Sequence, residues 1–486
     1  MTNQRAKWKI MVYMSADGLL ANFAVESLKQ LKRAAGDGVV VVAQLDTDAI
    51  IHARRYAFGA ESYDRGAGKR DGKGGGVSFL EGNKLKAKLP QKLQIADPKN
   101  LTKFIDDAVQ MDPPADHHAL FLWGHGPELL ADEDPVSKND SAKTKPRRYL
   151  TPSNLQEALR KAQLPIENNQ KKKIDILGLD ACSMSMVELA SELGDHVNFM
   201  VASQDDVPDQ SFPYEDILRR LGELANANDA RKASTSIPEV YRKAYSDYIS
   251  DPRTGFRPFT LSAIDLDKKK MGRLTTQLTT LARLLLELSK REDAGRKILT
   301  ARKKAQGFVF GLFVDIVDLC QKFRESDVSS NELKDTCLKI QQIIQDSKEV
   351  VIANAVHVNT GDGAPPDGNL VPGGLSIYFP YRVADPPDSL DQTEALQQLR
   401  AKGTREVHSK ERGLRIGELE QDFAKLQDFR GTDWMKFIQG GWSSILTKEA
   451  EQGRLDLDEV YSAQQCAQNL LRHEPPGGEY KERRAA

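Results

Sequence analysis

The sequence predicts an α/β protein with a mainly parallel central sheet, followed by a largely helical C-terminal region. Strand-length apolar runs alternate with amphipathic helical segments through the first half of the chain, a pattern typical of βαβ units. After Asp267 the pattern becomes that of a long helix reaching about Lys290, with leucines three or four residues apart. These two patterns define the predicted fold class.

The first strand–helix–strand unit lies at the N-terminus. Residues 8–14 are a continuous apolar run, and the helical pattern that follows places Leu28 and Leu31 on one face. A second apolar run covers residues 39–45. This spacing predicts two parallel strands and a helix that packs on the sheet.

Two further apolar runs end in reactive side chains. Residues 119–123 lead to His125, and residues 174–179 lead to Cys182. If both runs are neighbouring parallel strands, their carboxyl ends place an imidazole and a thiol at the same edge of the sheet. We also expect a helix over residues 183–193, whose N-terminus would lower the pKa of the Cys182 thiol.

A thiol and an imidazole in this arrangement can perform nucleophilic catalysis. A cysteine thiolate attacks a carbonyl carbon, and a nearby imidazole can protonate the leaving amine. His125 lies between two glycines, which favours a tight turn that a substrate can approach. The competing interpretations are an inert core thiol for Cys182 and a surface or capped residue for His125.

The rest of the chain supplies more elements. A helix is expected to begin at residues 151–153, where Thr or Ser can cap it and Pro suits its first position. Further strands are expected at residues 197–203, 259–264, 350–357 and 374–379, and a last helix near residues 457–472.

Composition narrows the classes of function. The chain has 486 residues with 69 basic and 70 acidic side chains, a balance that gives no reason to expect nucleic acid or a membrane as a partner. Four cysteines without a Cys-x-x-Cys pair indicate reduced thiols, with neither a zinc site nor a disulfide framework. The N-terminus does not resemble a signal peptide, and no apolar run has membrane length. We therefore expect a cytoplasmic protein.

Two motifs carry a family resemblance. Residues 123–126 (Trp-Gly-His-Gly) and 180–184 (Asp-Ala-Cys-Ser-Met) resemble the histidine and cysteine motifs of the clostripain family of cysteine peptidases, which belongs to the caspase-like clan. Further similar blocks lie at residues 8–14, 201–204 with 212–214 after it, 374–380 and 432–437. The resemblance covers about residues 8–440 and implies a caspase-like α/β/α sandwich.

The resemblance also implies three regions. Residues 1–265 would form the caspase-like catalytic domain. Residues 266–446 would form a helical region whose late strands return to the core, and residues 447–486 a polar helix and a disordered tail.

The same resemblance implies a catalytic dyad of His125 and Cys182 that cleaves proteins after Arg or Lys. The amides of Gly126 and Cys182 would hold the oxyanion. A buried basic side chain needs a charged partner, and Asp180 matches the family's acidic position. Its other interpretation is a carboxylate at a helix N-terminus. Further candidates for lining or charging the primary specificity pocket are Ser203, Gln204, Asp205, Asp206 and Asp209.

Relatives are often zymogens that are cut between the two motifs. Here the segment 128–150 is long and polar, with five basic residues: Lys138, Lys143, Lys145, Arg147 and Arg148. We expect cleavage there by this protease or by an upstream activating protease, and the alternative is that these are solvated loop charges. Some relatives need calcium. The sequence has no loop of the EF-hand type, so it requires no cofactor by itself.

Two alternative functions remain open. One is a caspase-like peptidase of different specificity. The other is a catalytically inactive binding protein on the same fold, and the intact His125 and Cys182 argue against it.

Overall fold

The computed structural model describes residues 5–16, 20–36, 38–47, 53–59, 94–126, 149–167, 169–208, 210–224, 229–250, 259–308, 312–327, 330–346, 349–357, 372–380, 422–423 and 425–452. The five candidate processing residues, Asp209, and the predicted helix near residues 457–472 with the tail lie outside these ranges. Among the described helices, none has the length and apolar character needed to span a bilayer.

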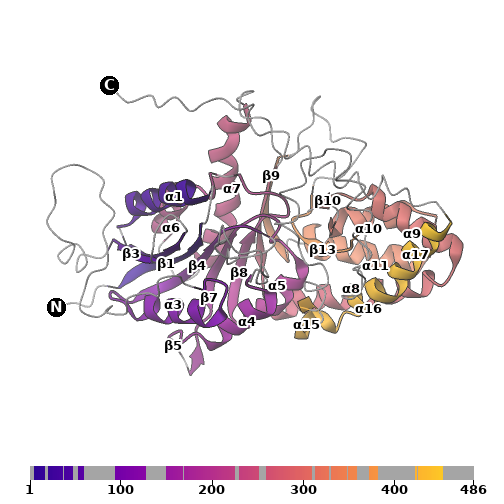
Figure 1. The fold of residues 1–486 in the computed structure, drawn as a ribbon, viewed down its shortest axis with the longest axis horizontal. Helices are drawn as coiled ribbons and strands as arrows, with labels where there is room; N and C mark the ends of the chain where they lie inside the picture. The colour runs from indigo at the N-terminus through magenta and orange to yellow at the C-terminus, as the bar shows by residue number, and fades with distance from the viewer. Residues whose placement is uncertain are drawn as a thin grey trace, which may run out of the picture.

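A large sheet forms the centre of the molecule (Figure 1). Within the described residues it has eight strands in the order β12-β9-β8-β7-β4-β1-β2-β3. They are β1 (Ala6–Ser15), β2 (Val39–Asp46), β3 (Arg54–Phe58), β4 (Ala115–Trp123), β7 (Ile174–Asp180), β8 (Val197–Ala202), β9 (Phe259–Asp265) and β12 (Val351–His357). The five strands from β2 to β8 pair in parallel, whereas β3, β9 and β12 add antiparallel edges. The predicted mainly parallel sheet is confirmed.

Helices cover both faces of this sheet. On one face, α1 (Leu20–Ala34), α6 (Tyr214–Glu223) and α7 (Asp229–Ser250) enclose one apolar core (Figure 1). On the other, α3 (Pro98–Gln110), α4 (Pro152–Lys161) and α5 (Val187–Leu193) enclose a second. A sheet buried on both faces needs continuous apolar strands, which explains the unbroken apolar runs in β1, β4 and β7. The architecture is the expected α/β/α sandwich.

The chain continues into a mainly helical region beside β9 and β12 (Figure 1). Its helices are α8 (Lys268–Leu288), α9 (Glu292–Lys304), α10 (Ile316–Glu325), α11 (Asn331–Gln341), α15 (Gln427–Arg430), α16 (Trp434–Lys436) and α17 (Ser443–Glu451), with π-helical turns at Gln342–Asp346 and Phe437–Trp442. The expected helix after Asp267 is confirmed, and the Asp267 side chain caps it by accepting hydrogen bonds from two backbone amides.

The two predicted late strands go to different sheets. β12 joins the central sheet, whereas β13 (Ser376–Tyr378) joins a small sheet with β10 (Gly307–Phe308) and β11 (Phe313–Asp315). A short hairpin of β5 (Ile166–Glu167) and β6 (Gln170–Lys171) lies apart from both. A single bridge between Met186 and Ser376 connects β13 to the segment that precedes α5.

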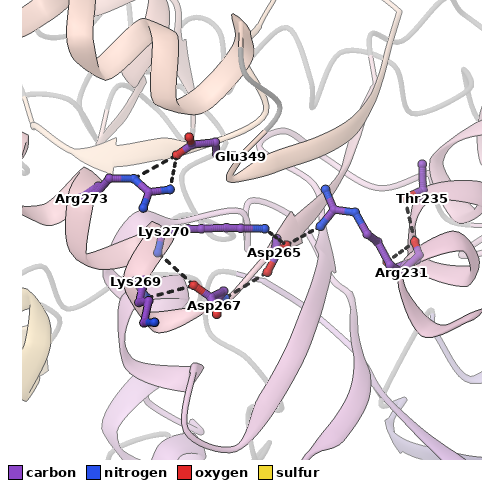
Figure 2. A network of polar contacts seen from close by, with 9 residues as sticks. Arg231, Thr235, Asp265, Asp267, Lys269, Lys270, Arg273 and Glu349 are labelled. Atoms are coloured by element: carbon purple, nitrogen blue, oxygen red, sulfur yellow. Dashed lines mark hydrogen bonds and ion pairs between the residues drawn. The ribbon is translucent and has the colours of Figure 1, made fainter. Parts of the chain in front are cut away.

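Ion pairs join the helical region to the end of β9 (Figure 2). The buried Asp265 carboxylate accepts from Arg231 on α7 and from Lys270 on α8, the latter at 2.5 Å. Arg273 bonds Glu349 at 2.5 Å, which ties α8 to the segment before β12. Because β9 runs antiparallel to β8, this network lies at the sheet edge opposite the carboxyl ends of β4 and β7.

Candidate active site

Strands β4 and β7 bring the two sequence motifs together. They are parallel neighbours, and Trp123 pairs with Asp180 at their carboxyl ends. The amide of Gly124 then donates to the Asp180 carbonyl at 3.2 Å. The turns that carry His125 and Cys182 therefore leave the sheet at one edge, as predicted.

The two turns touch through their backbones at Gly126. A Cβ atom added there would lie 1.9 Å from the Cys182 carbonyl oxygen and 2.8 Å from the Cys182 nitrogen. Only glycine permits so close an approach. His125, the preceding residue, is exposed to solvent, so the imidazole lies on an accessible turn held directly against the cysteine.

Cys182 does not lie at a helix N-terminus, so the prediction of a helix over residues 183–193 is wrong for its first four residues. Helix α5 begins only at Val187. Ser183 has a left-handed backbone with φ of 59°, and the Ser185 amide donates to the Ser203 carbonyl at 2.8 Å. Long-range pairing therefore replaces the first helical turn. Ser183 and Ser185 were the signal in the sequence that the helix begins later, because serine favours local alternatives to helix.

Cys182 as a residue is half-buried, and the loop that follows β8 contacts its thiol. The Val207 amide donates a hydrogen bond to its Sγ at 3.4 Å, and the thiol hydrogen-bonds to the Asp206 side chain. Burial raises the pKa of the Cys182 thiol well above its ordinary value, and the negative charges of Asp206 and Asp205 raise it further. The expected lowering of the thiol pKa is therefore wrong for this state, in which the thiol is protonated.

Asp180 is buried below this turn, and three donors converge on its Oδ2 atom. These are the Ser211 hydroxyl, the Phe212 amide at 3.2 Å and the Tyr214 hydroxyl at 2.8 Å. Burial raises the pKa of Asp180 to about 6, although the three hydrogen bonds oppose this rise. Asp180 does not cap α5, whose N-cap position is Met186 without a side-chain bond.

The segment after β8 places its side chains in different directions. Ser203 and Gln204 are fully buried. The Ser203 hydroxyl lies 2.9 Å from that of Thr260, and the Gln204 carboxamide donates to Asp315 at 2.8 Å. Asp205 accepts from the Asp206 amide at 2.9 Å, and burial, with the nearby Asp206 charge, raises the pKa of Asp205 to about 7.

Sequence reasoning gave no role to several residues that shape this site. Tyr214 belongs to a block with a family resemblance and Ser211 precedes that block, but nothing in the sequence indicated that they bond Asp180. Asp315 follows an apolar strand at the start of α10, a pattern that signals only a helix cap.

Two further properties bear on the chemistry. Among the described residues, the amides of Gly126 and Cys182 make no hydrogen bond. Within the same ranges, no three His, Cys, Asp or Glu side chains converge in a way that could hold a metal ion.

Comparisons with known proteins point to one family. A model of the clostripain family matches residues 12–438, whereas a search of curated proteins gave no match. Among solved structures, an inactive zymogen C11 protease from Parabacteroides distasonis is similar at 17% identity, with a TM-score of 0.50, over 81% of this chain and 96% of that one.

A secreted C11 cysteine protease from Bacteroides thetaiotaomicron, in complex with an irreversible peptide inhibitor, is similar at 16% identity with the same TM-score and coverage. At such identities the structures show a shared caspase-like fold, and the family model carries the assignment. Because that model spans most of the sequence, the chain belongs to the clostripain family of cysteine endopeptidases.

Proposed function

We propose that this protein cleaves polypeptides after Arg or Lys, with Cys182 as the nucleophile and His125 as the general acid. The observation that carries the proposal is the backbone contact between Gly126 and Cys182, because a Cβ atom at Gly126 would overlap the Cys182 carbonyl oxygen. This contact supports a site in which the imidazole turn and the thiol face the same scissile bond.

In the proposed reaction, the Cys182 sulfur bonds to the substrate carbonyl carbon, and its proton passes to the His125 imidazole. The Gly126 and Cys182 amides stabilise the oxyanion that forms. The C–N bond then breaks while His125 protonates the leaving amine. Water hydrolyses the thioester, which releases the acid product and returns the proton to the thiol.

The preference for a basic side chain rests on three carboxylates near the nucleophile: Asp180, Asp205 and Asp206. A guanidinium or ammonium group taken from water needs such partners. Burial raises the pKa values of Asp180 and Asp205 to about 6 and about 7, and no basic side chain of the described residues opposes either rise. A bound Arg or Lys side chain would supply a positive charge. Ser203 and Gln204, predicted to line the pocket wall, stay a prediction from the family resemblance.

Fluorogenic peptides that end in Arg, Lys or Asp test this specificity. We expect turnover of the Arg and Lys peptides only, with KM rising as the pH falls from about 7 to 6, because protonation of Asp205 and Asp180 removes negative charge. Asp206→Asn should lower kcat/KM for the Arg peptide by about tenfold or more. Cleavage of the Asp peptide alone would favour the peptidase of different specificity. No turnover of any peptide, even after limited proteolysis, would favour an inactive binding protein.

We also propose that the protein is a zymogen activated by cleavage within residues 128–150, by itself or by an upstream protease. A variant with alanine at Lys138, Lys143, Lys145, Arg147 and Arg148 should stay uncut and inactive, because a basic-specific protease has no site there. Masses of the purified chain before and after incubation, compared with those of Cys182→Ala, separate self-cleavage from cleavage by another protease. An unchanged cleavage pattern and onset of activity in the five-alanine variant would exclude this route.

The cytoplasmic location expected from the sequence stays a prediction. One solved neighbour is described as a secreted protease, so cell fractionation is needed to decide between the two compartments for this protein.

A further inference from the structure

A fully buried network of hydrogen bonds, the clasp, connects the loop after β8 (residues 203–207) to the C-terminal region. Its centre is the Gln204 carboxamide, which donates to Asp315 at 2.8 Å and accepts from the Gly374 amide at 2.8 Å. These partners lie 111 and 170 positions away in the chain. Two glycines make the approach possible, because a Cβ atom at Gly373 would lie 2.4 Å from Val317, and one at Gly374 would lie 2.7 Å from Ser262.

Asp315 has the geometry of a fixed anchor. Its Oδ2 atom accepts from Gln204 and from the Gly373 amide at 2.6 Å, and its Oδ1 atom accepts from the Asp318 amide at 2.8 Å. Three donors require an acceptor-only group, which an ionised carboxylate provides and an amide does not. Burial raises the pKa of Asp315 to about 6, so the carboxylate is mainly ionised at neutral pH.

The clasp also includes Ser185, which follows Cys182 in the turn, and Thr260 on β9. The Ser185 hydroxyl donates to the Gly374 carbonyl at 2.6 Å, and the Ser185 carbonyl accepts from the Ser376 amide at 2.8 Å. On β9, the Thr260 hydroxyl accepts from the Gln204 amide at 2.8 Å. The positions of the Cys182 turn and of the loop after β8 therefore depend on these hydrogen bonds as well as on β7, the strand before Cys182.

The clasp holds the loop after β8, which contacts the Cys182 thiol. Gln204 precedes Asp205, Asp206 and Val207, and the last two contact the Cys182 sulfur. We infer that Gln204 is a positioning residue, which through Asp315 and Gly374 fixes this loop and thereby sets the reactivity of Cys182. This inference deepens the proposed function, on which its catalytic meaning rests, and it gives the C-terminal region a part in the active site.

The test measures the reactivity of Cys182 without a peptide substrate. Gln204→Met keeps the side-chain size and removes both hydrogen-bonding groups. If the loop is released, Cys182 loses the burial and negative charge that keep it protonated. Alkylation of Cys182 by the neutral reagent iodoacetamide at pH 7.5 should then rise, by at most about tenfold for each unit by which its pKa falls, because a thiolate becomes less nucleophilic as its pKa falls. At the same time kcat/KM for an Arg peptide should fall by about tenfold.

Gln341→Met is the matched control. Gln341 is also a buried glutamine, but its carboxamide bonds Val317, Gln321 and Arg324 of α10 rather than the loop after β8. This variant should leave Cys182 alkylation unchanged. Thr260→Val removes different hydrogen bonds to the same loop, those of the Thr260 hydroxyl with Ser203, Gln204 and Asp205, and we expect a change in the same direction. It serves as a second variant in case Gln204→Met does not fold.

Mass spectrometry of each cysteine separates positioning from unfolding. Cys320 and Cys337 are fully buried in the helical region, so they report a general loss of structure. The inference is overturned if Cys182 alkylation is unchanged in both loop variants, or if Cys182, Cys320 and Cys337 become reactive together. If Gln204→Met instead changes only the KM for Arg peptides relative to that for Lys peptides, Gln204 lines the specificity pocket and does not position the loop. The outcome is independent of turnover, so failure of the proposed function would show separately as activity that survives Cys182→Ala.

Discussion

Replacement of Cys182 by alanine is expected to lower kcat for basic peptides by about 10⁴-fold or more, with little change in thermal stability. The thiol is the only group at this edge of the described sheet that we propose to form a covalent bond with the carbonyl carbon, and alanine cannot replace it. Initial rates on an Arg peptide, after removal of the candidate loop by limited proteolysis, measure the effect. Limited proteolysis is needed because Cys182→Ala could also fail to activate itself, and such a failure must be distinguished from loss of the catalytic nucleophile.

A matched cysteine elsewhere provides the control. Cys320→Ala removes a thiol that is fully buried in the helical region, so it should lower the melting temperature and leave kcat nearly unchanged. Full activity of Cys182→Ala, or equal losses in the two variants, would contradict the assignment of the nucleophile.

The second large effect is expected for Gly126→Ala. The added methyl group would lie 1.9 Å from the Cys182 carbonyl oxygen, far inside van der Waals contact, so the His125 turn must move away from the thiol. Displacement by about 1 Å at a reacting centre can cost about a hundredfold in rate, and we expect at least this loss in kcat/KM. Peptide kinetics and a melting curve measure the two consequences separately.

Gly272→Ala is the control for that substitution. Gly272 lies in α8, and a Cβ atom there would meet nothing within 4 Å. Because alanine favours helix over glycine by about 0.5–1 kcal/mol, this variant should be slightly more stable and fully active. If Gly126→Ala keeps wild-type kinetics, the contact between the two turns has no role in catalysis.

The sequence predicted the parts of the fold that depend on local patterns. Strands β4 and β7 are buried on both faces, so their runs are unbroken, and the reactive residues follow where the apolar pattern stops. Helix α4 begins at the Thr151-Pro152 signal, with the Thr151 side chain accepting from the Asn154 amide. These features follow from periodicity and capping, which a single sequence displays.

The sequence could not predict the features that depend on distant partners. The segment from Ser183 to Met186 has a helical pattern, yet Ser203 and Ser376 pair with it and hold it out of the helix. The state of the Cys182 thiol depends on Asp206 and Val207, which reach it only through the fold. Gln204 shows the same limit, because its partner Asp315 lies 111 residues away.

Covalent labelling tests the central claim most directly. The processed protein is treated with peptidyl chloromethyl ketones that end in Arg, Lys or Asp, and the labelled residue is mapped by mass spectrometry. The account predicts one label per chain, on Cys182, from the Arg and Lys reagents and little or none from the Asp reagent. A label on another residue, or equal labelling of Cys182 by all three reagents, would contradict a basic-specific site built around this thiol.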